Sequence, residues 1–408
     1  MALETVAIVG GGIGGLASAI LLSKKGFQVT VYDKAKSPQA VGAGFLLQPP
    51  GQEVLRKLGV LDEVLKQAVP ISGLQSKTTS GRTVLNLKYA GLKGKARSGL
   101  GVQRSTIYEA LLNKALKQKS LNVVWDSNID KCVSKDDFVS VVVDDTTQDY
   151  DLCVLSAGSN SHLAEGHFNN RVKKPYGWGC LWTTFKLPKT LSPNTLHQRC
   201  QQSNKMMGIL PVRKVDDSYE AALYWSMKSQ DLHELNETKF TAIKDEIMQF
   251  WPEAASSVEQ LEYTDFIPAN YNDIWTPKPF TNRLIAIGDV SHSTSPQLGQ
   301  GCTMALLDAW SLAMSIDKKD EELAHSLEQW WRSRRYQLAY VRHMSRFLTP
   351  LFQSDSKLCE LFRDWLMAPI GRLPIFDSLQ LKTLASDVFL TESVNVDETT
   401  EMELSQVE

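Results

Sequence analysis

The sequence predicts an α/β fold: a Rossmann-like domain, interrupted by a β-rich insert and followed by helices. Three observations favour it. The chain opens with an apolar segment, a glycine-rich turn and a helical repeat of apolar residues, all before residue 26. Alternating segments that contain Trp and Tyr occupy the middle of the chain, and helical periodicity dominates from Thr303 onward. Strands that alternate with helices are typical of a parallel sheet, whereas strict alternation predicts a half-buried strand.

The composition narrows the class of protein. A chain of 408 residues is long enough for two domains, and its formal net charge of −2 provides no basic footprint for nucleic acid. No run of about 18 apolar residues occurs, and the N-terminus lacks the basic start of a signal peptide. The six cysteines are far apart, without His at ligand spacing. We therefore expect reduced thiols, no metal site and a cytoplasmic location.

The N-terminal segment has the pattern of a βαβ unit. Residues 6–9 predict a buried strand, residues 14–25 a helix that stops at Gly26, and residues 27–33 a second strand. Between the first strand and the helix, Gly10, Gly12 and Gly15 have the spacing G-x-G-x-x-G. Each glycine has its own reason to lack a side chain: a tight turn, close approach to a pyrophosphate, and helix–strand packing.

The same unit contains an acid where a ribose is expected. Asp33 ends the second strand, the position at which a carboxylate accepts hydrogen bonds from ribose hydroxyls. The helix start adds free N–H groups and a positive dipole end. We therefore expect the turn Gly10-Gly11-Gly12-Ile13-Gly14-Gly15, which includes Ile13 and Gly14, to bind the pyrophosphate of a dinucleotide. Taken alone, the turn permits NAD as readily as FAD.

A second glycine turn lies far downstream. Residues 284–287 predict a buried strand that ends in Gly288-Asp289, and Pro296 and the turn Gly299-Gln300-Gly301 precede a helix. The free amides at that helix start would face an anionic group, such as the N1 and C2-carbonyl region of a reduced flavin. Asp289 could hold a ribityl or ribose hydroxyl.

These residues resemble the flavin-contacting motif of the single-component FAD-dependent aromatic hydroxylases, the family of p-hydroxybenzoate hydroxylase and the ubiquinone-biosynthesis hydroxylases. Residues 41–49 resemble the family's loop beside the isoalloxazine ring, and Gln103-Arg104 matches a position that contacts FAD. The resemblance spans roughly residues 4 to 345, with the motifs in the family's order. It implies that FAD is bound by the first glycine turn, by Asp33 and by the following residues: Gly44, Gln48, Arg104, Asp289, Pro296, Gly299, Gln300 and Gly301.

The resemblance also implies an activity. NADPH or NADH would bind transiently and reduce the flavin, and oxygen would add to give a C4a-hydroperoxide. That species would hydroxylate an aromatic or other electron-rich apolar small molecule. The protein would position the substrate and exclude water.

The domain boundaries follow from the same pattern. We expect a discontinuous FAD-binding domain at 1–72, 99–175 and 278–340, and a substrate-binding sheet at 73–98 and 176–277. Helices would fill 341–391, and the acidic, aperiodic residues 392–408 predict a disordered tail. After Pro252 the sequence predicts a loop.

The chain departs from the family near its middle. The family usually has an Asp-Gly motif followed by Ser and Arg, whereas here Ala157 replaces the Asp and Ala164 replaces the Arg; Gly158 and Ser161 match. The resemblance assigns that motif to FAD and nicotinamide contacts, so reduction by NAD(P)H is the step affected. An FAD-binding protein with repurposed or lost monooxygenase activity is therefore the alternative.

Other residues have two interpretations. The aromatic residues Trp178, Trp182, Tyr224 and Trp225 could line a flat apolar pocket or fill a core. His292 could be catalytic or simply buried and bonded, and no residue pair stands out as a substrate base, so we name no catalytic side chain. Residues 330–335 and 347–352 mix basic and bulky apolar side chains. We favour helices packed on the FAD domain over peripheral membrane contact.

Overall fold

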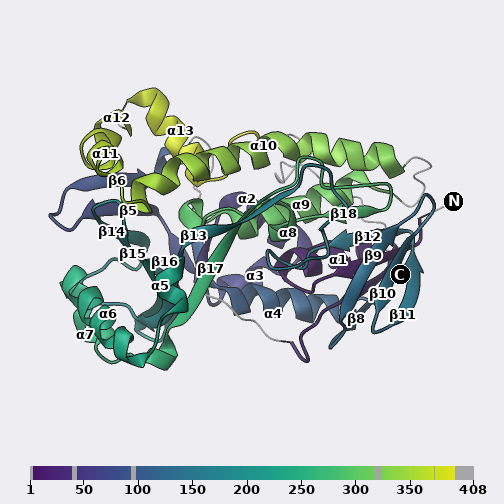
Figure 1. Ribbon diagram of the computed structural model, residues 1–408, viewed down its shortest axis with the longest axis horizontal. Coiled ribbons are helices and arrows are strands. Elements are labelled where there is room, and N and C mark those ends of the chain that lie inside the picture. The colour runs from purple at the N-terminus through teal and green to yellow at the C-terminus, as the bar shows by residue number, and fades with distance from the viewer. Residues whose placement is uncertain (1–2, 39–43, 93–97, 318–322, 372, 391–408) are drawn as a thin grey trace.

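The computed structural model describes residues 3–38, 44–92, 98–317, 323–371 and 373–390. The predicted acidic tail and part of the loop at 41–49 lie outside these residues. The described chain forms an elongated molecule with the parallel sheet at one end, a long twisted sheet in the middle and the last helices at the other end (Figure 1).

A five-stranded parallel sheet organises the N-terminal part of the fold. Its order is β18-β12-β1-β2-β8, and every neighbouring pair is parallel. The strands are short and apolar, as expected when helices cover both faces. They are β1 (Thr5–Val9), β2 (Gln28–Tyr32), β8 (Leu121–Val124), β12 (Leu152–Leu155) and β18 (Leu284–Ala286).

Helices pack on this sheet and on one another. Helix α1 (Ile13–Lys24), which follows β1, contacts both α9 (Gly301–Ser315) and α4 (Arg104–Ala115). Their apolar residues share one core cluster with β1 and β2. The helices are α1 (Ile13–Lys24), α2 (Pro49–Leu58), α3 (Leu61–Leu65), α4 (Arg104–Ala115), α8 (Asp289–His292) and α9 (Gly301–Ser315).

The described chain also forms two small antiparallel sheets. The first is a meander in the order β11-β10-β9, which packs beside β12. The second has the order β3-β7-β4 and contacts the large sheet through β15 (Lys205–Val215). The strands are β9 (Ile129–Ser134), β10 (Val139–Val143), β11 (Thr146–Tyr150), β3 (Gly44–Leu47), β4 (Val69–Ile71) and β7 (Gly99–Gln103).

The large sheet has seven strands in the order β17-β13-β16-β15-β14-β5-β6. Long strands cross the middle of the molecule (Figure 1). One face packs against helices that lie between β16 and β17 in the chain. The strands are β5 (Gly73–Thr78), β6 (Thr83–Lys88), β13 (Val172–Lys186), β14 (Thr195–Gln201), β15 (Lys205–Val215), β16 (Ser218–Lys228) and β17 (Ile267–Trp275), and the helices are α5 (Ser229–His233), α6 (Glu237–Phe250) and α7 (Ala255–Val258).

The C-terminal part is helical. A 30-residue helix, α10 (Leu323–Phe352), runs along one edge of the molecule from the parallel sheet toward the last helices (Figure 1). These are α11 (Lys357–Leu361), the π-helical segment η5 (Phe362–Met367), α12 (Ala368–Gly371) and α13 (Pro374–Leu384). Short 3₁₀ segments complete the described chain: η1 (Tyr89–Gly91), η2 (Pro252–Ala254), η3 (Tyr263–Asp265) and η4 (Pro296–Leu298).

The predicted fold class, a Rossmann-like domain with an inserted β-sheet and C-terminal helices, is confirmed. The prediction of a loop after Pro252 is wrong. That stretch holds η2, α7, η3 and the nine-residue β17, and its pairing with β13 is interrupted by a register shift between Pro175 and Gly179. β17 lies at the edge of the sheet, contains Pro268 and is exposed or partly exposed along most of its length. Its sequence therefore lacks the alternation of apolar and polar residues that predicts a strand.

Candidate functional site

The three glycines of the first turn have different surroundings. Gly10 has a φ of +103°, and a Cβ there would lie 2.5 Å from the Ser156 carbonyl oxygen. A Cβ on Gly15 would lie 1.9 Å from the Gly10 carbonyl oxygen, because helix α1 passes directly over the turn. A Cβ on Gly12 would meet no atom within 4 Å. The fold itself therefore requires Gly10 and Gly15, whereas the bare backbone of Gly12 faces open space.

The start of α1 is built to receive an anion. Gly12 is the N-cap residue and provides no side-chain hydrogen bond to the first turn, so the helix amides stay available. Asp33, at the end of β2, accepts hydrogen bonds from the backbone N–H of Gly11 at 2.6 Å and of Ala35 at 2.8 Å. Asp33 therefore fixes the turn in place. Its contact with a ribose stays a prediction.

The second glycine turn presents another uncapped helix start. Gly299 has a φ of +61°, and Gln300 is the N-cap of α9 without a side-chain cap. The Gln300 side chain is buried; its amide nitrogen donates to the carbonyl oxygen of Thr383 on α13, and its Oε1 has no partner. Asp289 begins α8 after β18, and its carboxylate lies 3.6 Å from where a Cβ on Gly301 would be. Gly288-Asp289 thus follows a strand of the parallel sheet, as the first glycine turn does, and α8 and a 3₁₀ segment lead from there to the second glycine turn.

A buried ion network supports the Gly288-Asp289 segment that follows β18. Asp308 on α9 accepts hydrogen bonds from the Gly288 backbone N–H at 3.0 Å, from His292 Nε2 at 2.5 Å and from Arg334 Nε at 2.8 Å. Burial alone would raise the pKa of Asp308, but His292 and Arg334 outweigh it and hold the pKa at about 2. His292 is therefore bonded to a carboxylate and helps to position the Gly288 turn.

Sequence reasoning missed this network. Arg334 belongs to the basic, aromatic stretch 330–335, which has a second interpretation as a membrane-facing surface. Instead Arg334 and Trp330 are fully buried between α9 and α10, and the Trp330 indole N–H donates to the Asp308 carbonyl. The packed interpretation is confirmed for these two residues. The available signal was Asp308 itself, an acid inside an otherwise apolar helix face.

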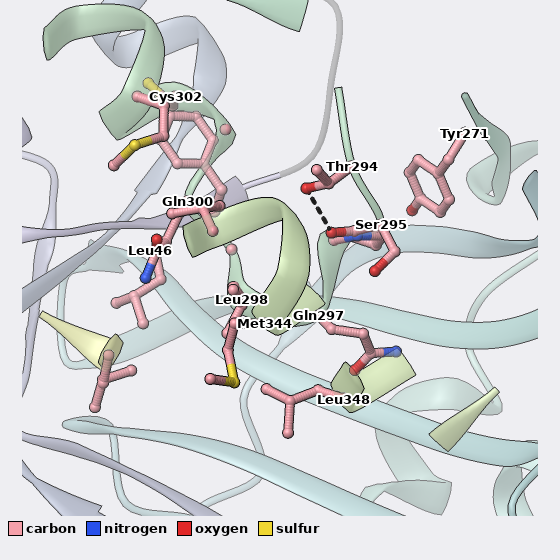
Figure 2. A pocket seen from close by; sticks show the side chains of 18 of the residues that line it. Leu46, Tyr271, Thr294, Ser295, Gln297, Leu298, Gln300, Cys302, Met344 and Leu348 are labelled. Atoms are coloured by element: carbon pink, nitrogen blue, oxygen red, sulfur yellow. Dashed lines mark hydrogen bonds between the residues drawn. The ribbon is translucent and has the colours of Figure 1, made fainter. Parts of the chain in front are cut away.

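A single cavity of about 830 Å³ connects both glycine turns with the large sheet and α10. Figure 2 shows Gln300, Cys302 and Leu46 at this cavity together with Tyr271, Thr294 and Ser295. Most of the predicted site residues line it: Gly12, Ile13, Gly14, Gly44, Arg104, Trp182, Tyr224, Asp289, Pro296, Gly299, Gln300 and Gly301. Gly44 also has a packing role, because a Cβ there would lie 2.3 Å from Val212.

Other predicted residues do not line this cavity. Gly10, Gly15 and Asp33 shape the turn from behind, and buried Gln48 accepts a hydrogen bond from the Tyr89 hydroxyl at 2.5 Å. Trp225 points to the opposite face of the large sheet and packs edge-on against Phe250 at 5.1 Å. Trp178 lies 5.8 Å from the Lys228 ammonium. Of the four aromatic residues, the cavity thus brings together only Trp182 and Tyr224.

The motif in which this chain departs from the family, with Ala157 and Ala164, follows β12. Ser156, Gly158 and Ser159 line the cavity, and Gly158 has a φ of +77° with open space where a Cβ would be. Ala164 is fully buried in the core between β12 and the meander, beside Leu163 and Phe168. An arginine at position 164 would have to place its charge in that apolar core. The family's usual arginine is therefore incompatible with the packing seen here.

Across the described ranges, no helix has the length and apolar character needed to cross a bilayer, and no group of three or more His, Cys, Asp or Glu side chains is arranged to hold a metal ion.

Two uncapped helix starts, the open backbone at Gly12 and the unpaired Gln300 Oε1 all lie where an extended dinucleotide would run. The residues present thus fit a cofactor with a pyrophosphate at α1 and a polar ring system at α9.

Relatives with known activities align with most of the chain. A 6-hydroxynicotinate 3-monooxygenase of Pseudomonas fluorescens is 26% identical over 81% of this chain and 88% of its own. A 2-heptyl-3-hydroxy-4(1H)-quinolone synthase of Pseudomonas aeruginosa is 24% identical over 76% of this chain and 80% of its own.

Solved structures share the fold. A 2-methyl-3-hydroxypyridine-5-carboxylic acid oxygenase matches with a TM-score of 0.73 and 18% identity over 85% of this chain and 93% of its own. The p-nitrophenol 4-monooxygenase PnpA of Pseudomonas putida matches with a TM-score of 0.78 and 16% identity over 94% and 98%. The sequence profile described as "FAD binding domain" covers residues 4–326, and the chain therefore belongs to the FAD-binding-domain family.

Proposed function

We propose that this protein is an FAD-dependent monooxygenase that hydroxylates an aromatic or other electron-rich apolar small molecule, with NADH or NADPH as reductant. The observation that carries the proposal is the continuous cavity from the start of α1, past the start of α9, to the apolar face of the large sheet. A cofactor held at the two helix starts would have its reactive ring at that face. The activities named for the relatives are of the same kind.

The residues have separable tasks in this proposal. FAD supplies hydride acceptance and dioxygen activation when it is bound. The open backbone of Gly12 would accommodate the pyrophosphate, and Asp289 would hold a sugar or ribityl hydroxyl. The amides at the start of α9 would stabilise negative charge on the reduced ring, as helix N-termini do for anions. Arg104, which also lines the cavity, places a cation at the same end.

The sheet side of the cavity would exclude water from the reaction. Trp182, Tyr224 and Leu210 line it, and Leu338 and Val341 approach from α10. An apolar enclosure protects a reactive oxygen donor from unproductive breakdown and strengthens electrostatic interactions inside it. No side chain in this lining is assigned as a substrate base.

The alternative, a flavoprotein without monooxygenase activity, is separated by reduction kinetics. We expect NADPH or NADH to reduce the bound FAD within the turnover time when an aromatic ligand is present, as followed by loss of flavin absorbance. Dithionite provides the control for chemically reducible flavin. If only dithionite reduces the flavin, the alternative is supported. Ala157→Asp should then accelerate reduction if the missing acid limits an otherwise competent enzyme.

A further inference from the structure

The charged side chains of the cavity are gathered at one end. Among the described residues that line it, the only Lys, Arg, Asp and Glu are Arg104 and Asp289, both beside the glycine turns. A cofactor in that end would use these two charges. His292 also lines the cavity, but its Nε2 lies 2.5 Å from the Asp308 carboxylate. The rest of the lining offers no Lys or Arg for a substrate carboxylate, whose burial without a partner is costly.

The other end of the cavity, here called the aliphatic end, is long and mostly apolar, although Phe347, Phe352 and the polar Gln353 also line it. Residues at helical spacing on α10 form one stripe along it: Leu338, Val341, Met344, Leu348 and Leu351. Leu351 lies thirteen positions after Leu338, which corresponds to about 20 Å of helix at the usual rise. Figure 2 shows Met344 and Leu348 of this stripe with Leu298 at the pocket. Across from the stripe, Leu85, Leu196 and Met206 of the large sheet complete the lining.

The stripe is fixed in place by a polar anchor at its side. The Ser295 hydroxyl lies 2.8 Å from the Ser345 hydroxyl and 2.6 Å from the Thr349 hydroxyl, so the loop after α8 is tied to α10. These three hydroxyl groups are buried and form hydrogen bonds with one another. The aliphatic end is therefore a preformed part of the fold.

The aliphatic end reaches the surface between α10 and α13. Phe347, Phe376 and Leu379 line the cavity and are also 59%, 45% and 38% exposed. Large apolar side chains seldom remain exposed together unless a ligand or partner uses them. The cavity thus has an apolar mouth lined by α10 and α13, and α13 also contacts the second glycine turn through Thr383 and Gln300.

The polar groups between the two ends are neutral. Cys180 Sγ lies 2.8 Å from the Tyr271 hydroxyl, and the buried Gln297 side-chain nitrogen has no partner. Burial raises the pKa of Cys180 to about 11 and raises the pKa of Tyr271 well above its usual value. At neutral pH these groups can exchange hydrogen bonds with a neutral phenol, amide or carbonyl.

We propose that the substrate is a neutral, hydroxylated or heteroaromatic ring with an aliphatic tail, and that the tail lies along the α10 stripe while the ring lies between Gln297 and the flavin end. The hydroxylation of this substrate rests on the proposed function, whereas its binding along α10 does not. The proposed substrate differs from the pyridine carboxylates in the names of two relatives and is closer to the heptylquinolone in the name of a third.

The test uses the FAD-loaded, full-length protein and the probes phenol, 4-n-propylphenol, 4-n-heptylphenol and 4-hydroxybenzoate. Their dissociation constants are measured from the change in flavin absorbance or fluorescence, without turnover. Burial of each methylene is expected to tighten binding about threefold, so 4-n-heptylphenol should bind at least about 100-fold more tightly than phenol. Affinity that is flat with chain length, or a preference for 4-hydroxybenzoate over 4-n-heptylphenol, overturns the inference.

Two variants locate the tail. Leu348→Glu places a charge in the aliphatic end, and Met344→Trp fills it without charge. Each should remove most of the chain-length dependence, measured as the ratio of the dissociation constants of phenol and 4-n-heptylphenol. Leu358→Glu is the matched control, because Leu358 is 79% exposed and does not line the cavity. If both cavity variants load FAD normally and keep the wild-type chain-length dependence, the placement along α10 is wrong.

Turnover distinguishes this inference from the proposed function. Chain-length-dependent binding without NAD(P)H-dependent hydroxylation would refute the monooxygenase and leave the tail site standing. Hydroxylation of short phenols without any gain from the tail would refute the tail site and leave the monooxygenase standing.

Discussion

At the first glycine turn, two substitutions of the same kind should have different consequences. Gly12→Ala adds a methyl group in open space, so the fold should keep its thermal stability while the affinity for FAD falls at least about tenfold, because the methyl blocks the backbone approach. Gly15→Ala adds a methyl group 1.9 Å from a carbonyl oxygen and should destabilise the apoprotein itself. Melting temperatures with and without FAD measure both effects. Equal loss of apoprotein stability in the two variants would contradict these roles.

The buried Asp308 should make a pH-dependent contribution to stability. Asp308→Asn leaves Arg334 buried without its counter-charge, so the free energy of unfolding at pH 7 should fall by about 3–5 kcal/mol. The folded-state pKa of about 2 is below the ordinary value. The contribution is therefore complete above about pH 5 and is lost as the pH falls through the ordinary value toward 2.

Urea unfolding at several pH values checks this prediction. The difference between wild type and Asp308→Asn should shrink between pH 5 and pH 2. The exposed Asp216→Asn serves as the control and should change stability little at any pH. A difference that is independent of pH would mean that the stabilisation comes from shape and not from charge.

Among the elements, α13 is coupled to the second glycine turn. The Gln300 side chain donates to the Thr383 carbonyl, and the Tyr340 hydroxyl lies 2.5 Å from the Thr383 hydroxyl. FAD binding beside Gln300 should therefore slow amide hydrogen exchange in 374–384 relative to the apoprotein. Gln300→Ala should reduce that protection. If exchange in α13 does not respond to FAD, the helix is an independent wall of the cavity.

The sequence predicts elements well where one local pattern decides them. β1, α1 and β2 lie within one or two residues of the expected bounds, because an apolar run, helical spacing and Gly26 each indicate the same structure. β17 was missed because its strand character depends on β13, about 90 residues away in the chain. Likewise, the strand alternation of Trp225 fits either face of the sheet, and only packing against Phe250 settles which face it occupies.

At the scale of the whole molecule, the cavity depends on segments from the entire chain. Its lining begins at Gly12 and ends at Leu384, and it includes residues of the large sheet and of α10. The sequence motifs predict its cofactor end, since each turn carries its own chemical signature. Its aliphatic end has no motif: single Leu, Met and Phe residues become a lining only when α10 lies opposite the sheet. That part could not be predicted without the tertiary structure.

In the proposed function, one oxygen atom of dioxygen is inserted into an electron-rich substrate at this cavity. The most direct measurement supplies the FAD-loaded protein with NADPH or NADH, 4-n-heptylphenol and ¹⁸O₂, and determines the mass of the products. We expect a hydroxylated product that carries one ¹⁸O atom, formed with matching consumption of the nicotinamide. Oxidation of the nicotinamide that yields only hydrogen peroxide with each phenol tested, or a product whose oxygen comes from water, would contradict it.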